Sequence, residues 1–332
     1  MALSSTTTKI PTTTPTAETT AKRKRRRRQR EKLDKNAKIV IVGSGLGGLG
    51  AAISLEQAGF TNVLVVERDL SAQQQRKGYG LTLGYNPKGP LARMNVLERV
   101  AEKDCPSRSH YMFNPKGNVL SYYGNAFSPP NRGLGQRGNL RVPRQVLRQI
   151  LMNQLKLSSI SFGRRVVGLE PEECGEADDE NDNDNHRSPL LAVRFDDGTA
   201  ERNVELVVAA DGIRSAVVKS LLPDDDRGLR CLGVFIILGI ATFAHPLLDE
   251  RGFYTLSGRE RLFTMPYAGS RFDGTQHRQV MWQLSFCTDS AESLRRLDSS
   301  GLRELVLTKC RNWHEPVVDM VQATPLETVW GT

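Results

Sequence analysis

Residues 38–67 read KIVIVGSGLGGLGAAISLEQAGFTNVLVVE, and this stretch decides the fold. Its first part, KIVIVG, is a short and nearly continuous apolar run, which is typical of a strand buried on both faces of a parallel sheet. Small and apolar residues then recur at helical spacing as far as Gly59, a residue type that commonly ends a helix. The segment NVLVVE predicts a second buried strand. Together these segments predict a β-α-β unit with two parallel strands and a crossover helix.

The turn between the first strand and the helix contains a G-x-G-x-x-G motif at Gly43, Gly45 and Gly48. Gly43 permits a tight turn, Gly45 lets backbone N–H groups approach a pyrophosphate, and Gly48 lets the helix pack closely on the strand. Phosphates would lie at the helix N-terminus, where unpaired N–H groups and the helix dipole favour negative charge. The predicted phosphate-binding loop consists of Gly43, Ser44, Gly45, Leu46, Gly47 and Gly48.

Two acidic residues follow buried strands and are candidates for binding a nucleotide. Glu67 lies 19 residues after Gly48, where a carboxylate accepts hydrogen bonds from ribose hydroxyls, and its charge disfavours a 2′-phosphate. The site therefore favours FAD or NAD over NADP, and we include the adjacent Arg68 in it; the alternative is a packed β-α-β unit with a surface Glu and no ligand. Asp211 and Gly212 follow VELVVAA, so Asp211 either caps the next helix or binds a ligand at the carboxyl edge of the sheet.

The positive charge of the chain is concentrated at its N-terminus. The formal net charge is +9 over 332 residues; residues 1–30 hold nine basic residues and one acid, and the other 302 residues hold 37 basic and 36 acidic residues. Nothing in the folded part therefore calls for nucleic acid as a partner. Residues 1–36 are predicted to be a disordered basic tail, either a nuclear or organellar signal or a solvated extension without an address. The compartment stays open, with the cytoplasm as the default.

Several classes of protein and site are excluded by composition and spacing. The longest apolar run, 232–244, has 13 residues, too few for a transmembrane helix. The five cysteines form no C-x-x-C pair and the five histidines form no helical pair, so we expect no metal site. The acidic insert 171–189 lacks an EF-hand pattern and is predicted to be a disordered loop between two hairpin strands.

The remaining segments alternate between helical and extended patterns. Helices are predicted over 91–104 and 143–157, and one strand over 199–211. The runs SFGRRVVGLE and LLAVRFDDG predict paired strands, and residues 230–288 are rich in strand patterns. The end of the chain contains amphipathic helical patterns. The predicted fold class is mixed α/β.

Five segments, taken in order, resemble the class A flavoprotein monooxygenases of the p-hydroxybenzoate hydroxylase type over about residues 38–330. They are IVGSGLGGLGAAISLEQAGFTNVLVVERD, GYGLTLGYNP, LRVPRQVLRQILMNQL, VRFDDG and VELVVAADGIRSAVVKSLL. The resemblance implies a Rossmann-like FAD-binding domain with an inserted β-sheet substrate domain. It matches Arg144 to an arginine against the FAD phosphates, and Asp211 and Gly212 to a motif that binds FAD and pyridine nucleotide.

The chemistry implied by the resemblance belongs to the cofactor. FAD is bound tightly and non-covalently, NAD(P)H binds transiently and reduces it, and O₂ then gives a C4a-hydroperoxide that hydroxylates a small organic substrate, aromatic in type. No residue is therefore assigned as a catalytic acid or base. Tyr254, Tyr267, Trp282 and His245 lie in the implied substrate sheet, where a core or rim role is the simpler interpretation of each.

The resemblance also implies a domain organisation. The predicted segments are a basic tail (1–36), an FAD-binding β-α-β unit (37–110), a first part of the substrate domain (111–140), a continuation of the FAD-binding domain (141–228), a substrate-domain sheet (229–290) and a C-terminal helical segment (291–332).

The sequence departs from the family pattern at its end. A Gly-Asp motif followed by Ala-Ala-His is absent, so we expect a C-terminally truncated architecture. Three alternatives to hydroxylation stay open: another FAD-dependent reaction on the same fold, such as reduction or epoxidation; a catalytically inactive FAD-binding protein; and a non-enzymatic nucleotide-binding protein directed by its basic tail. The sequence predicts no oligomeric state.

Overall fold

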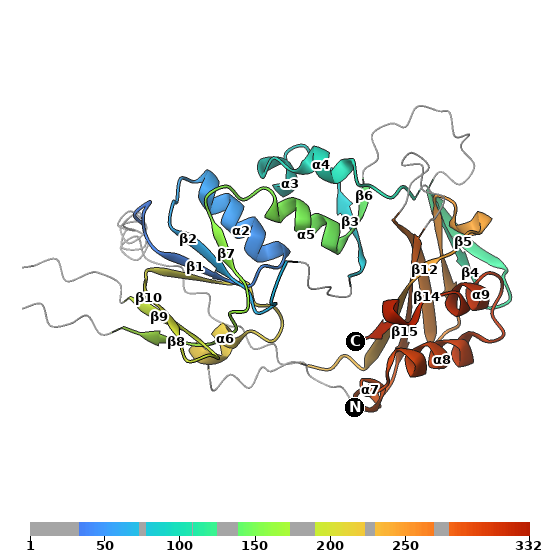
Figure 1. The fold of residues 1–332 in the computed structure, drawn as a ribbon. Coiled ribbons are helices and arrows are strands. Elements are labelled where there is room, and N and C mark those ends of the chain that lie inside the picture. The colour runs from blue at the N-terminus through green and yellow to red at the C-terminus, as the bar shows by residue number, and fades with distance from the viewer. Residues whose placement is uncertain are drawn as a thin grey trace, which may run out of the picture.

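The computed structural model divides the chain into two lobes (Figure 1). It describes residues 33–72, 78–107, 109–124, 139–172, 190–222, 230–268 and 279–332. The predicted disorder of residues 1–36 falls almost entirely outside these ranges, as does that of the insert 171–189. The mixed α/β class predicted from the sequence is confirmed by the sheets and helices described below.

The first lobe is built on a four-stranded parallel sheet. Its order is β11 (Leu206–Ala209), β1 (Ile39–Val42), β2 (Val63–Val66) and β7 (Ser159–Ser161). All four residues of β1 are buried, as the apolar run KIVIVG predicts for a central strand. Helix α2 (Leu46–Gln57) crosses between β1 and β2 and buries one face on the sheet.

Three further helices accompany this sheet: α3 (Pro90–Arg93), α4 (Leu97–Ala101) and α5 (Arg144–Met152). The prediction of a single helix over 91–104 is wrong, because the helical conformation is interrupted at Asn95, whose φ is 58°. That left-handed conformation ends a helix, and asparagine tolerates it better than most residues. The predicted helix over 143–157 is shorter than expected and ends at Met152.

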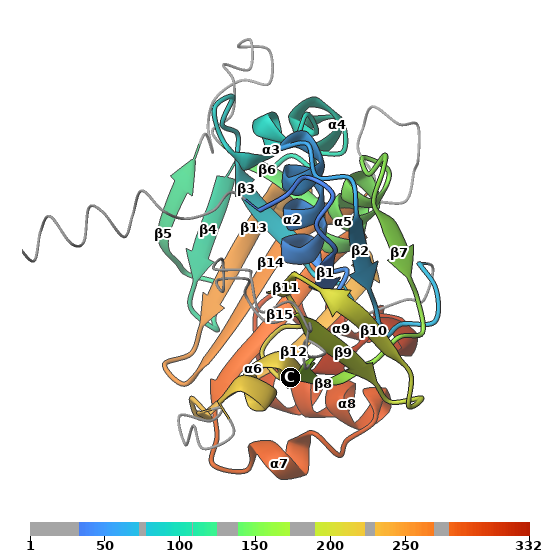
Figure 2. The ribbon, with the colours of Figure 1, turned by 90° about the vertical axis from the view of Figure 1, so that its left-hand side faces the viewer.

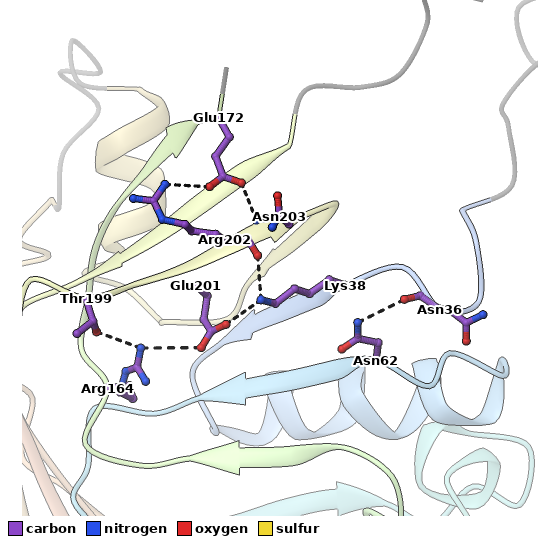
Figure 3. A network of polar contacts seen from close by, with 9 residues as sticks. All are labelled: Asn36, Lys38, Asn62, Arg164, Glu172, Thr199, Glu201, Arg202 and Asn203. Carbon is purple, nitrogen blue, oxygen red and sulfur yellow. Dashed lines mark hydrogen bonds and ion pairs between the residues drawn. The ribbon is translucent and has the colours of Figure 1, made fainter. Parts of the chain in front are cut away.

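A second, antiparallel sheet lies beside the first in the same lobe. It consists of β8 (Val166–Pro171), β9 (Leu191–Phe195) and β10 (Ala200–Val204), with α6 (Ala216–Leu221) against β8. The strand predicted over 199–211 is thus two strands in different sheets. Polar contacts fix this division: Lys38 Nζ lies 2.9 Å from Glu201 Oε2 and donates to the Arg202 carbonyl at 2.8 Å (Figure 3).

The second lobe contains a seven-stranded sheet. Its order is β16 (Trp330–Gly331), β12 (Val234–Thr242), β15 (Gln279–Cys287), β14 (Glu260–Ala268), β13 (Arg251–Leu256), β4 (Ser109–Phe113) and β5 (Val119–Gly124). One face is covered by α8 (Ser299–Cys310) and α9 (Val317–Gln322), and Trp282 on that face donates to Thr324 Oγ1 at 2.8 Å. The remaining short elements are η1 (Pro246–Leu248), α7 (Ala291–Leu294) and η2 (Leu326–Thr328).

The opposite face of this sheet, here called the inner face, is turned toward the first lobe (Figure 2). A two-stranded ribbon, β3 (Gly80–Gly84) and β6 (Asn139–Pro143), connects the lobes. Its apolar side chains pack on the helices of the first lobe, whereas the alternate residues face the sheet: the Gly80 N–H donates to Met281 Sδ at 3.2 Å. Tyr267 Oη donates to the Gly78 carbonyl at 3.3 Å. The described residues contain no helix that is both long and apolar enough to cross a membrane.

Candidate functional site

The loop 43–48 follows β1 and has two structural glycines. Gly43 has a φ of 101°, and a Cβ there would lie 2.6 Å from the Ala210 carbonyl oxygen. A Cβ at Gly48 would collide with the Gly43 carbonyl oxygen. Both positions therefore require glycine for the loop to turn and for α2 to start where it does.

The other two glycines leave the backbone open. A Cβ added at Gly47 would have no atom within 4 Å. The nearest atom to a Cβ added at Gly45 would be Arg144 Nη2, at 3.9 Å. Gly45 is the N-cap of α2, and no side chain caps this helix. The first N–H groups of α2, a helix of 12 residues, thus point to a space bordered by the Arg144 guanidinium. These features fit the phosphates of a dinucleotide such as FAD.

Glu67 occupies a more enclosed position than its predicted ribose contact suggests. Its side chain is 3% exposed, and Oε2 accepts from the Ser44 N–H and Ser44 Oγ, both at 2.8 Å. Its Oε1 accepts from the Asp69 N–H at 3.0 Å. In this structure Glu67 therefore holds the loop 43–48 against the end of β2. Arg68, the next residue, is exposed.

Sequence reasoning missed Arg148, which supports the same loop from α5. Its Nε donates to the Ser44 carbonyl at 3.0 Å and its Nη2 donates to Ser44 Oγ at 2.7 Å. Arg148 is 5% exposed and Ser44 is fully buried. The buried carboxylate of Glu67 and the buried guanidinium of Arg148 are thus joined through one hydroxyl. The signal that could have revealed Arg148 is its i,i+4 spacing from Arg144, which puts both arginines on one face of a helix.

The structure brings the second sequence motif to the same loop. Asp211 Cα lies 3.3 Å from the position of a Cβ on Gly43, although 168 residues separate the two in sequence. Asp211 Oδ2 accepts from the Ala216 N–H at 2.7 Å, so the carboxylate caps α6 together with the N-cap residue Ser215, whose side chain accepts from the Val218 N–H. Its Oδ1 is buried and has no hydrogen-bond partner within the described ranges. The two roles weighed from the sequence are compatible, because one oxygen caps the helix and the other is available to a ligand. The adjacent Gly212 is exposed, with a φ of 84°.

The inner face of the seven-stranded sheet carries a cluster of rings. His110 stacks on Tyr123 with ring centroids 5.1 Å apart and on Phe263 at 5.8 Å, and Tyr254 lies 4.8 Å from Phe263. Burial, with the nearby charge of Arg141, lowers the pKa of His110 to about 4. Burial and a hydrogen bond with Tyr254 raise the pKa of Tyr123 to about 12. His110 and Tyr123 are therefore neutral near pH 7.

The aromatic candidates in the sheet differ in what they face. Trp282 lies in the core against α9 and points away from the inner face. His245 Nδ1 accepts from the Leu247 N–H at 3.2 Å and caps η1. Tyr267 joins the two lobes, and only Tyr254 belongs to the ring cluster. No group of three or more metal-ligating side chains occurs among the residues described.

Comparison with known proteins identifies the family. The FAD-binding domain family model matches residues 36–293, more than half of the chain. The chain belongs to this family. The predicted fold class and the predicted membership of the class A FAD-dependent monooxygenases are thereby confirmed. The enzyme class is oxidoreductase, and the cofactor class is FAD.

Two relatives found by sequence and one solved structure are similar to this chain. The chain is 26% identical over 294 residues to YetM of Bacillus subtilis, and the alignment covers 84% of this chain and 70% of YetM. The name of YetM assigns it provisionally to the FAD-dependent monooxygenases. It is 25% identical over 301 residues to the chloroplastic zeaxanthin epoxidase of Nicotiana plumbaginifolia, covering 89% and 41%. The structure of Klebsiella pneumoniae HpxO with FAD and uric acid superposes with a TM-score of 0.66 at 20% identity, covering 89% and 67%, which shows a shared fold. The chain thus spans less than half the length of the epoxidase.

We predict that the hydrogen bonds of Ser44 with Glu67 and with Arg148 contribute to stability as one coupled unit, here called the Ser44 bridge. Ser44→Ala removes one hydrogen-bond partner from each of two buried charged groups, Glu67 and Arg148, and should lower the free energy of unfolding by about 1–3 kcal/mol. Arg148→Met should cost at least as much, and the double variant should cost less than the sum of the two. Chemical denaturation of the single and double variants measures this. Ser54→Ala, on the exposed side of α2, is the control, and strictly additive costs would contradict the bridge.

We also predict a pH dependence that arises from His110. Its pKa in the folded protein lies below the ordinary value of 6.5, so the unfolded chain takes up the proton first as the pH falls. As the pH falls from about 6.5 to 4, this difference lowers the free energy of unfolding progressively, by about 2.5 kcal/mol at pH 4.5. His110→Phe, which keeps a ring in the stack, should remove this part of the acid destabilisation. Parallel stability curves for the two proteins over that range would contradict the prediction.

Proposed function

We propose that this chain binds FAD non-covalently through the loop 43–48 and uses it to hydroxylate a small organic substrate at the expense of NAD(P)H and O₂. The observation that carries the proposal is the uncapped N-terminus of α2, which opens beside Gly45, Gly47 and the Arg144 guanidinium. Bound FAD supplies the hydride acceptance and oxygen activation that amino-acid side chains lack.

The residues of the loop divide into ligands and supports. Backbone N–H groups at Gly45 and Gly47 bind phosphate oxygens, and Arg144 donates a charge-assisted hydrogen bond to them. Glu67 and Arg148 keep the loop in the binding conformation through Ser44, which reduces the entropy lost when the cofactor binds. A ribose contact for Glu67, and contacts for Arg68 and Gly212, remain predictions from the sequence.

Asp211, which lies against Gly43 of the loop 43–48, is proposed to bind the cofactor as well. Its Oδ1 has no partner in the described part of the chain, and such a buried acceptor is costly unless a donor reaches it. A hydroxyl group of the bound cofactor is a donor of the right kind. The capping bonds to α6 hold the carboxylate in place while it accepts that bond.

The inner face is the proposed substrate surface, because it faces the lobe that holds the nucleotide loop. Its β12 residues Ile236, Leu238 and Ile240 are apolar, and the ring cluster lies on the same face toward the opposite edge of the sheet. Apolar walls exclude water from the reacting centre. A neutral His110 adds no charge to this surface near pH 7. Epoxidation on the same fold is the second candidate, since the epoxidase relative aligns over 89% of this chain.

The test is retention of flavin by the purified protein. After addition of excess FAD and desalting, the protein should keep the visible absorption of flavin, and NAD(P)H should bleach it under anaerobic conditions. Arg144→Met should raise the Kd for FAD about tenfold, the value of one lost charge-assisted hydrogen bond. Arg93→Met, an exposed arginine on α3, is the matched control. Failure of the unaltered protein to retain FAD, or an unchanged Kd in the Arg144 variant, would contradict the proposal.

A further inference from the structure

Strand β5 forms one edge of the seven-stranded sheet, and every one of its residues is exposed. It pairs with β4, and no second strand lies beside it in the described part of the chain. Figure 2 shows β5 beyond β4 at the outer side of the sheet. Four of its side chains are large and apolar: Val119 is 55% exposed, Leu120 57%, Tyr122 50% and Tyr123 46%.

The other edge strands carry features that discourage pairing with a further strand. In the three-stranded sheet, β10 holds Glu201 and Arg202, which both form ion pairs. At the edge of β8, Ser220 of α6 accepts from the Leu169 N–H at 3.0 Å and donates to the Leu169 carbonyl at 3.2 Å. Strands β7, β11 and β16 have four residues or fewer. With six residues, no charge and no proline, β5 is the longest uncharged edge strand in the described ranges, and such an edge accepts another strand.

The edge of β5 is held in a regular conformation by its own sheet. Ser121–Gly124 pair in antiparallel register with Ser109–Met112, and the register shift of this ladder comes at Leu120. On the inner face the Tyr123 ring stacks on His110. The neighbouring Tyr122 points to the opposite face, because side chains alternate along a strand. The strand therefore needs little rearrangement to receive a partner, which reduces the entropy lost on association.

We propose that β5 pairs antiparallel with β5 of a second copy of this chain, about a two-fold axis close to Ser121. The Val119–Leu120 end of one strand then lies opposite the Tyr122–Tyr123 end of the other, and such aliphatic–aromatic pairs across strands are stabilising. A two-fold axis brings each charge near the axis close to its own copy. Because β5 has no charge in a chain of net charge +9, this edge is suited to contact with an identical chain.

The second copy would also cover the open side of the ring cluster formed by His110, Tyr123, Tyr254 and Phe263. Tyr123 is the outermost ring of this cluster, because β5 is the last strand of the sheet. Side chains on the inner face of the second β5 would lie against it and extend the apolar surface. A role of this contact in substrate binding rests on the proposed function. The association itself does not, because it needs only the edge of β5.

The experiment is sedimentation velocity of the full chain without added flavin, from about 1 to 100 µM. One pair of short strands makes a small interface, so we expect a dimer that dissociates at about micromolar concentrations. Leu120→Lys places two like charges near the axis and should raise the Kd of the dimer about tenfold or more. The matched control is Leu157→Lys, which changes a leucine of the first lobe that is 62% exposed and should leave this Kd unchanged.

Hydrogen exchange of the unaltered protein locates the contact without any variant. Backbone amides of residues 119–124 should exchange more slowly at about 100 µM than at about 1 µM, whereas exchange in α8 should not depend on concentration. A monomer throughout the range, an equal Kd in Leu120→Lys and the unaltered protein, an equal loss in Leu157→Lys, or exchange in β5 that ignores concentration would each overturn the proposal. If Leu120→Lys does not fold, the exchange comparison decides. Failure of FAD binding would change none of these outcomes.

Discussion

The buried contact between the Glu67 carboxylate and Ser44 is the constraint on which the nucleotide loop depends. Ser44 presents both its N–H and its hydroxyl to one carboxylate oxygen, and Arg148 binds the same serine from the opposite side. The opposite charges of Glu67 and Arg148 compensate each other through this residue. Without that compensation neither group would be stable at an exposure of 5% or less. The loop is thereby fixed before any ligand binds.

That fixed loop determines what the rest of the fold contributes. Helix α2 starts at Leu46 after the N-cap residue Gly45 and has no side-chain cap, so its free N–H groups define one boundary of the proposed cofactor site. The ribbon of β3 and β6 then connects this lobe to the inner face of the large sheet, through contacts such as Gly80 to Met281.

Much of this arrangement could be predicted from the sequence, because it depends on local patterns. The apolar runs at β1 and β2 and the spacing of Gly43, Gly45 and Gly48 predict the β-α-β unit and its loop. Arg148 could not be predicted, since its role comes from contacts between segments far apart in sequence. The division of residues 199–211 into two strands was missed for the same reason: the Lys38 contacts that fix it are tertiary.

The most direct test of the central claim is hydrogen exchange of the backbone amides with and without FAD. If the loop 43–48 is the phosphate site and is held ready by Glu67 and Arg148, FAD should slow exchange at residues 44–49 by about tenfold or more. Exchange in α8, which covers the far face of the other lobe, should not change. Retention of FAD with no added protection at residues 44–49 would contradict the account.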